Sequence, residues 1–286
     1  MAVAPEGTRA VAGDWLPDTA EVASMEHTDS PHSVSVIVTT CGNPPTLERC
    51  LRSVLHSDYD DFEVIVVDHG PPSPDTARML VTQFPGELRL RYLEEPWSSA
   101  SMARNTGLAR AEGVVVAFID DDAVVDAQWI RHSVEPLLDE ADVVCVTGRS
   151  ASPQVHDAKR LAAELTGEGS SRRTYRRSDA RNGHDPLLAH TAGGLGSGAG
   201  IVMLADVGRE LGGFDVALGP ATPACGGEHI DLLGRLLRSG YTISYEPNAI
   251  IWREHPAHAE ARRRQILRYG IGLGAIISKR LITGPE

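Results

Sequence analysis

The chain has 286 residues, of which 42% are hydrophobic and 23% are charged. This composition is typical of a globular protein and excludes a chain that is disordered throughout. Its 27 Lys and Arg residues face 39 Asp and Glu residues, a formal net charge of −12. We therefore predict no nucleic-acid partner, because general nucleic-acid binding requires a basic surface.

Residues 1–32 show no apolar periodicity, and we expect them to form a flexible leader before a fold that starts at residue 33. The sequence has neither a basic and apolar secretory signal nor a run of about 18 apolar residues. Its four cysteines form no C-x-x-C pair, which favours reduced thiols. These features predict a cytoplasmic location.

The first half alternates strand and helix. Continuous apolar runs predict strands at Val34–Thr39, Glu63–Asp68, Leu88–Leu93 and Val114–Ile119. Helical spacing predicts helices at Leu47–Leu55, Ala77–Phe84 and Ser101–Ala111. Such runs indicate an α/β fold with a mostly parallel sheet flanked by helices. Ligands bind beyond the carboxyl ends of such strands, where Thr39, Asp68 and Asp120–Asp122 should converge.

The second half is more irregular, and we expect it to elaborate the same domain, so that residues 33–286 form one unit. Strands are predicted at Val143–Thr147, Ile201–Leu204 and Tyr241–Tyr245, and helices at Asp231–Leu237 and Ala261–Leu281. An arginine-rich stretch lies between the first two of these predicted strands, at Arg172, Arg173, Arg176, Arg177 and Arg181. It is either a lid that reaches for phosphates or a solvated loop. The last helix mixes arginines with apolar residues, so it either touches a membrane surface or packs on the core.

Three adjacent carboxylates, Asp120, Asp121 and Asp122, follow the strand that ends at Ile119. Their mutual repulsion needs an offset, and a divalent cation such as Mg²⁺ or Mn²⁺ supplies one. Aspartates also cap helix N-termini. The triplet alone leaves both interpretations open.

The order of several short motifs is more specific than any one of them. Val34–Thr39, Val64–Asp68, Ala103–Gly107, Asp120–Asp122, Gly212–Asp215 and Gly226–Glu228 follow one another along the chain. This series resembles the family 2 glycosyltransferases, which have the GT-A fold, from about Val34 to about Leu281. The resemblance implies metal-dependent, inverting transfer of a sugar from a nucleotide-diphospho-sugar, UDP-linked, to an acceptor hydroxyl.

The resemblance also assigns residues to the donor. It implies that Thr39 and Asp68 hold the nucleobase, that Arg104 approaches the nucleotide, and that Asp120 and Asp121 reach the ribose or the metal. Residues 33–147 then form the nucleotide-binding half. Residues 148–286 form the acceptor-binding half and the C-terminal helix; the acceptor is a small molecule, a glycan or a lipid-linked group.

The metal assignment follows in the same way. The resemblance implies that Asp122, with Asp120, binds Mn²⁺ or Mg²⁺, which neutralises the departing diphosphate. A family segment with Trp followed by one or two His matches Ile251–His255, so His255 is expected to complete the metal site. Arg253 stands where another His is common.

The general base is where the sequence departs from the family. The family usually has Asp after Gly-Gly-Glu, and His229 stands at that position. Histidine can accept a proton near neutral pH, so His229, Glu228 and Asp231 are all candidates. The departure leaves open a non-catalytic protein that only binds sugar nucleotides. A nucleotidyltransferase is disfavoured because Cys41–Pro45, after the first strand, contains no cation.

A last short match is Gln265-Ile266-Leu267-Arg268-Tyr269, which looks like the Q-x-x-R-W segment of polysaccharide synthases with Tyr for Trp. An arginine on such a helix could hold the diphosphate. The match is short, however, and a solvent-exposed amphipathic helix is the favoured interpretation.

Overall fold

The computed structural model describes residues 33–71, 74–151, 173–175, 198, 200–253 and 259–283. At 173–175, 259, 261–262 and 283 it describes the backbone alone. The chain divides into Met1–Ser30 and a compact unit, Pro31–Glu286. The predicted leader lies outside the described residues, as do His255 and all of the arginine-rich stretch except the backbone of Arg173.

The first half of the unit alternates strand and helix as predicted. Its elements are β1 (Val34–Thr40), α1 (Pro44–Leu55), β2 (Phe62–His69), α2 (Pro74–Gln83), β3 (Leu90–Glu95), α3 (Ala100–Arg110) and β4 (Val115–Asp120). The strands lie in the order β3-β2-β1-β4 and are all parallel. Their carboxyl ends therefore meet at one edge of the sheet.

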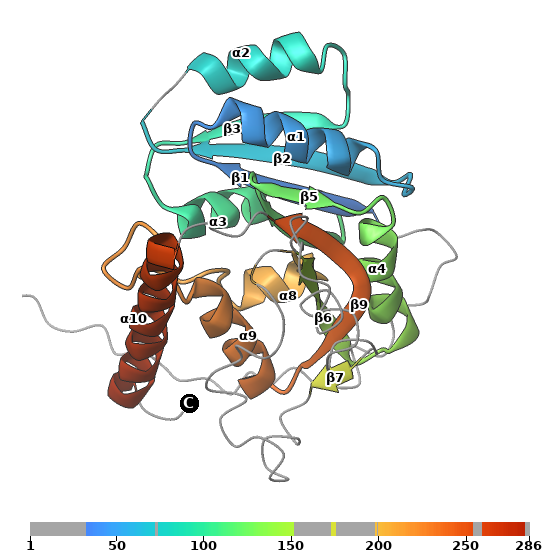
Figure 1. Cartoon of the computed structure of the whole chain (residues 1–286). Coiled ribbons are helices and arrows are strands. Elements are labelled where there is room, and N and C mark those ends of the chain that lie inside the picture. Colours follow the sequence, from blue (N-terminus) through green and yellow to red (C-terminus); the bar gives the residue numbers. More distant parts are fainter. Residues whose placement is uncertain are drawn as a thin grey trace, which may run out of the picture. The chain divides into compact units, whose positions relative to one another are not determined.

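Helices on both faces explain the continuous apolar run of β1, whose seven residues are all buried. Val36 and Val38 join a core cluster with Leu47 and Leu51 of α1. Ile37, between them, joins the opposite cluster, which includes residues of α3. Figure 1 shows α1 and α2 over one face of these strands and α3 over the other. Both faces of β1 are thus covered by apolar core.

The second half completes the sheet. Its elements are β5 (Ala123–Val125), α4 (Trp129–Asp139), β6 (Val143–Ala151), β7 (Arg173–Tyr175), β8 (Ile201–Leu204), α8 (Ala205–Glu210), α9 (Glu228–Arg238), β9 (Thr242–Arg253) and α10 (Ala259–Thr283). The sheet continues from β4 in the order β8-β6-β9-β5, and β7 pairs with β9.

Strand direction is mixed in this half. Of the pairings it adds, β6 with β9 is parallel, whereas β8 is antiparallel to β4 and β6, and β9 is antiparallel to β5 and β7. The predicted parallel arrangement thus holds for the first four strands. Four elements of this half were not predicted from the sequence: β5, α4, β7 and α8. Strand β9 is longer than the predicted Tyr241–Tyr245.

Candidate active site

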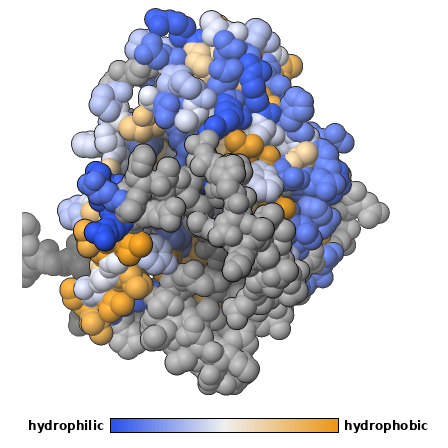
Figure 2. All heavy atoms as spheres, in the orientation of Figure 1, coloured by the Kyte–Doolittle hydropathy of each residue, from blue (hydrophilic) through white to orange (hydrophobic). Residues whose placement is uncertain are grey.

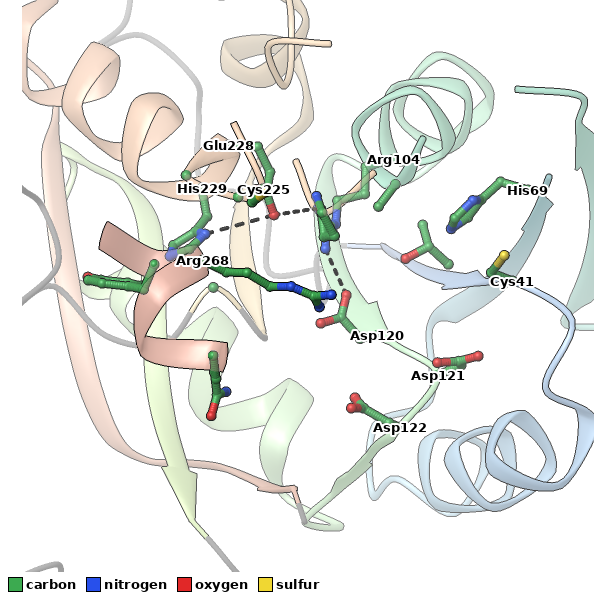
Figure 3. Close-up of a pocket in the computed structure, with 18 of the residues that line it drawn as sticks. Cys41, His69, Arg104, Asp120, Asp121, Asp122, Cys225, Glu228, His229 and Arg268 are labelled. Carbon is green, nitrogen blue, oxygen red and sulfur yellow. Dashed lines mark hydrogen bonds and ion pairs between the residues drawn. The ribbon is translucent and has the colours of Figure 1, made fainter. Parts of the chain in front are cut away.

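A cavity of about 880 Å³ opens at the carboxyl ends of the parallel strands. This volume lies within the range of ligand-binding pockets. Its walls come from the ends of β1, β2 and β4, the start of α9, the end of β9, and α3 and α10. Figure 3 shows the acidic triplet on one side of this cavity and the start of α9 on the other. The sequence-predicted edge is therefore a site built by both halves of the chain.

The acidic triplet lies where β4 ends, and all three carboxylates line the cavity. Thr40 Oγ1, at the end of β1, donates a hydrogen bond of 2.6 Å to Asp121 Oδ2. Burial raises the pKa of Asp121, and the neighbouring Asp122 and Asp120 raise it further, to about 6, although the Thr40 hydrogen bond opposes them. The three carboxylates, which the sequence predicted to repel one another, therefore do lie close together.

Arg104 ties the two sides of the cavity together. Its Nη2 lies 2.7 Å from Asp120 Oδ1 and its Nη1 lies 3.1 Å from Glu228 Oε1. The side chain is 7% exposed and packs over the Phe214 ring. Arg104 lines the cavity, but its guanidinium is already engaged by two carboxylates, and its predicted approach to the nucleotide stays a prediction. We infer that it mainly fixes the positions of Asp120 and Glu228.

Glu228 and His229 open α9 and both line the cavity. Burial raises the pKa of Glu228, but the His229 contact and the charge of Arg104 lower it more, to about 2. His229 Nδ1 lies 3.9 Å from Glu228 Oε1. Two glycines, Gly226 and Gly227, lead into the helix with φ of 151° and 94°, a conformation that side chains rarely adopt. The Gly-Gly pair thus sets the entry to α9.

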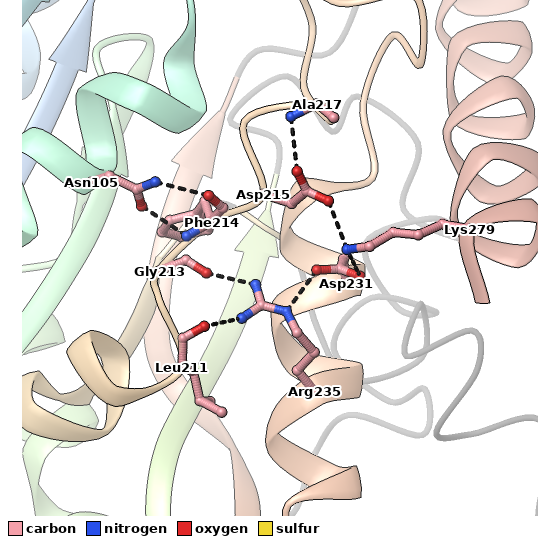
Figure 4. Close-up of polar contacts among 9 residues, drawn as sticks. All are labelled: Asn105, Leu211, Gly213, Phe214, Asp215, Ala217, Asp231, Arg235 and Lys279. Atoms are coloured by element: carbon pink, nitrogen blue, oxygen red, sulfur yellow. Dashed lines mark hydrogen bonds and ion pairs between the residues drawn. The ribbon is translucent and has the colours of Figure 1, made fainter. Parts of the chain in front are cut away.

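Asp231, the third candidate for the general base, does not line the cavity. Its carboxylate is 1% exposed; Oδ2 lies 2.7 Å from Arg235 Nε and Oδ1 lies 3.2 Å from Lys279 Nζ. The structure therefore gives Asp231 a place in a polar network between α9 and α10, which Figure 4 shows. It does not bring Asp231 together with Glu228 and His229.

Of the two residues predicted to contact the nucleobase, the structure places one in the cavity and the other outside it. Thr39 lines the cavity, but Asp68 does not. Asp68 pairs in register with Thr40, and its Oδ2 accepts a hydrogen bond of 3.4 Å from the Tyr92 hydroxyl. The next residue, His69, reaches the cavity instead. Among the described residues its buried Nδ1 has no hydrogen-bond partner, so it can still bond a ligand.

Asp120 and Asp122, two of the residues predicted to hold a metal, form ion pairs with Arg253. Arg253, the last residue of β9, places Nη2 2.7 Å from Asp122 Oδ1 and Nη1 3.2 Å from Asp120 Oδ2. Within the described part of the chain, no group of three or more His, Cys, Asp or Glu side chains could hold a metal ion. Because the guanidinium already occupies the oxygens that a metal would need, the described residues do not fit a metal site. His255 lies outside them.

Residues 263–270 of helix α10 are exposed, as expected, and part of this exposed face forms a wall of the cavity. Gln265, Arg268 and Tyr269 line the cavity, and Figure 3 shows Arg268 pointing toward Asp120. Lys279, further along the helix, lies 2.6 Å from Asp215 and 3.2 Å from Asp231 (Figure 4). The short Q-x-x-R match was the signal for this wall.

Four parallel strands carry an acidic triplet at their carboxyl edge, which faces the start of a helix that bears Glu and His. This arrangement agrees with a glycosyltransferase of the GT-A fold. The family model described as "Glycosyl transferase family 2" matches residues 35–195, more than half of the chain. The chain therefore belongs to the family 2 glycosyltransferases.

Curated relatives agree with this family. The chain is 29% identical over 231 residues to a pre-mycofactocin glycosyltransferase of Mycobacterium tuberculosis, which covers 79% of this chain and 43% of the relative. It is 28% identical over 151 residues to a validoxylamine A glucosyltransferase of Streptomyces hygroscopicus, covering 49% of this chain and 35% of the relative. The chain thus spans less than half the length of these relatives.

Solved structures agree with the fold. A mannosyltransferase of Pyrobaculum calidifontis, in complex with GDP-mannose and Mn²⁺, aligns with a TM-score of 0.58 at 18% identity, over 87% of this chain and 68% of that one. TarS 1–349 of S. aureus, in complex with UDP-GlcNAc, aligns with a TM-score of 0.58 at 17% identity, over 80% and 60%.

Proposed function

We propose that this chain transfers a glycosyl group, with inversion, from a nucleoside diphosphate sugar to an acceptor hydroxyl, and that the donor is UDP-linked. The observation that carries the proposal is that His229 and Glu228 share one cavity with the acidic triplet. Family membership and two solved neighbours whose ligands are nucleotide sugars support the donor class. The cavity is thus lined by carboxylates, by three guanidinium groups and by two imidazoles.

His229 is the general base of this proposal. Its Nδ1 faces the Glu228 carboxylate, which leaves Nε2 to accept the acceptor's proton. As the acceptor oxygen bonds to the anomeric carbon, the bond from that carbon to the diphosphate oxygen breaks and the proton moves to His229. Glu228, with a pKa of about 2, stays negative and favours the imidazolium that forms.

Two further groups position the reactants. Arg268, which points into the cavity from α10 (Figure 3), is placed to pair with the departing diphosphate, because guanidinium binds phosphate through parallel hydrogen bonds. Gly198 packs against His229: a Cβ there would lie 2.6 Å from Cγ of the imidazole. The glycine therefore leaves room for the ring in this position.

The test is a comparison of His229→Ala, Glu228→Gln and His132→Ala. The rate of UDP release is measured from UDP-glucose and UDP-N-acetylglucosamine with a panel of alcohol and sugar acceptors. We expect His229→Ala to lose on the order of 10²–10⁴ in turnover while it keeps its affinity for UDP.

His132→Ala is the matched control, because His132 also lies near a glutamate, 3.3 Å from Glu135, but on α4 outside the cavity. It should keep wild-type turnover. Near-normal turnover of His229→Ala would remove His229 from the role of general base. UDP binding without turnover by the wild type on any acceptor would support the binding-only alternative.

The cytoplasmic location and a contact of α10 with a membrane surface stay predictions. Exposed apolar side chains gather over α10 in Figure 2, among them Ile266, Leu267, Leu281 and Ile282. Of the helices in the described ranges, none combines the length and the apolar character that crossing a bilayer requires.

A further inference from the structure

Arg253 lies next to the acidic triplet because the sheet holds it there. In the antiparallel pairing of β5 with β9, Arg253 lies opposite Ala123, the residue that follows Asp122. Its Nη2 is 2.7 and 2.8 Å from the two oxygens of Asp122, and its Nη1 is 3.2 Å from Asp120. The side chain is 27% exposed and lines the cavity. A backbone ladder, rather than a loop, thus presents this cation to the carboxylates.

The charge of the cavity shows why a cation is needed at this point. Four carboxylates line it, from the triplet and from Glu228. Arg104 is engaged by Asp120 and Glu228. A diphosphate that enters brings more negative charge close to these carboxylates and is repelled unless a cation lies between them. The cation therefore has to stand against the triplet. Arg268 points toward Asp120 from α10, and Arg253 is the guanidinium that pairs with both Asp120 and Asp122.

A guanidinium can do this work without a metal. It has five N–H donors, forms parallel hydrogen bonds to carboxylate and to phosphate, and keeps its charge at every physiological pH. The contacts of Arg253 with Asp120 and Asp122 leave donors for phosphate oxygens. A divalent ion, in contrast, would first have to displace Nη2 from both oxygens of Asp122.

We propose that Arg253 takes the place of the divalent cation in this site, so that the chain binds the diphosphate of its donor without a metal. The inference rests on the proposed function, because it concerns a nucleoside diphosphate donor. It explains why arginine stands at a position where the family commonly has histidine.

The first experiment needs no variant. Titration calorimetry measures the Kd of UDP for the whole chain in EDTA and again in Mn²⁺. We expect the two values to agree within about twofold. A wild type that binds UDP only with Mn²⁺ overturns the inference and leaves the proposed function standing. If neither UDP, GDP nor dTDP binds in either buffer, the proposed function fails and the inference fails with it.

Two substitutions then test the residue. Arg253→Met should weaken UDP binding in EDTA on the order of tenfold or more, because the diphosphate then faces the carboxylate of Asp122 without the guanidinium that pairs with it. Arg78→Met is the matched control, since Arg78 also pairs with an aspartate, Asp75, but on the exposed surface of α2. It should bind UDP as the wild type does. Unchanged binding by Arg253→Met would overturn the inference.

Arg253→His restores the residue type that the family commonly has there. We expect this variant to bind UDP poorly in EDTA and to regain affinity in Mn²⁺, and we expect it to remove free Mn²⁺ from the electron paramagnetic resonance signal. The wild type should leave that signal unchanged. Stoichiometric Mn²⁺ binding by the wild type would contradict the inference even if both variants failed to fold.

Discussion

The carboxylate of Glu228 lies almost fully buried beside Arg104, with an imidazole on its other side. Burial alone would favour the neutral acid, but the hydrogen bond with His229 and the charge of Arg104 favour the charged form more strongly, so that its pKa falls to about 2 from an ordinary 4.5. The charge balance of the site therefore includes a permanent negative charge at the start of α9.

This pKa predicts how the stability of the protein depends on acid. A group whose pKa is lower in the folded chain stabilises the fold above its unfolded pKa, and this contribution is lost as the pH falls toward the folded pKa. The free energy of unfolding should therefore decrease between about pH 4.5 and 2, with a contribution from Glu228 on the order of 3 kcal/mol. Urea titrations across this pH range measure it.

Glu228→Gln should flatten this part of the pH dependence. The control is Asp206→Asn, because Asp206 is 89% exposed and pairs with Arg209 in solvent. Solvent screens such a pair, so the change should be small. An equal effect of both substitutions would show that Glu228 is not the strongly shifted group.

The site residues that are easiest to find from the sequence are those that stand next to one another in short motifs. The triplet, Glu228 and His229 are adjacent residues in short motifs, and all five line the cavity. Arg253 was noted only as a departure, because it is 131 residues from Asp122 and only the β5–β9 register brings the two together. Asp231 was named as a candidate base, but its ion pair with Lys279 of α10, which holds it away from the cavity, also depends on tertiary packing that the sequence pattern does not show.

At the scale of elements, the approach of α10 to the loop before α9 determines how Arg268 enters the cavity. Gly272 lies one helical turn after Arg268 and packs against the backbone of Gly226 and Gly227. A Cβ on Gly272 would lie 2.9 Å from the Gly226 carbonyl carbon and 3.1 Å from the Gly227 nitrogen. Backbone atoms cannot swing aside, so a side chain here would move the helix.

Gly272→Ala should therefore destabilise the protein by about 1–3 kcal/mol and weaken UDP binding, because Arg268 moves with α10. Chemical denaturation and calorimetry measure the two effects. Gly274→Ala is the matched control on the same helix: its Cβ would meet nothing within 4 Å. It should instead stabilise the helix by about 0.5–1 kcal/mol. Effects of the same sign at both glycines would contradict the close packing.

Element prediction succeeded throughout the first half. It missed four elements of the second, of which α4 is long, with 11 residues, and the other three are short. The seven strands and helices of the first half were all predicted to within a few residues. In contrast, β5 has three residues and α8 has six, too few for a pattern to show. The antiparallel direction of β8 could not be predicted either, because a strand that is buried on both faces has the same apolar pattern whether it runs parallel or antiparallel to its neighbours.

At the scale of the whole molecule, one core cluster joins the two predicted halves. It contains Ile37 and Phe118 from the first half, Leu233 from α9 and Ile276 from α10, all of them almost fully buried. The cavity likewise takes walls from both halves. Neither half can expose its share of this core without disrupting the other, so we expect residues 33–286 to unfold as one domain.

The prediction is a single cooperative transition in guanidinium chloride. Tryptophan fluorescence follows Trp129, the first residue of α4, which is fully buried in the core, whereas Trp97 and Trp252 are exposed. Far-UV circular dichroism follows all helices, including α10. The two curves should coincide. UDP at about 100 times its Kd should shift both together, by about 2.7 kcal/mol, since it binds only the folded site. Two separate transitions, or a shift by UDP in one probe alone, would show instead that the halves fold independently.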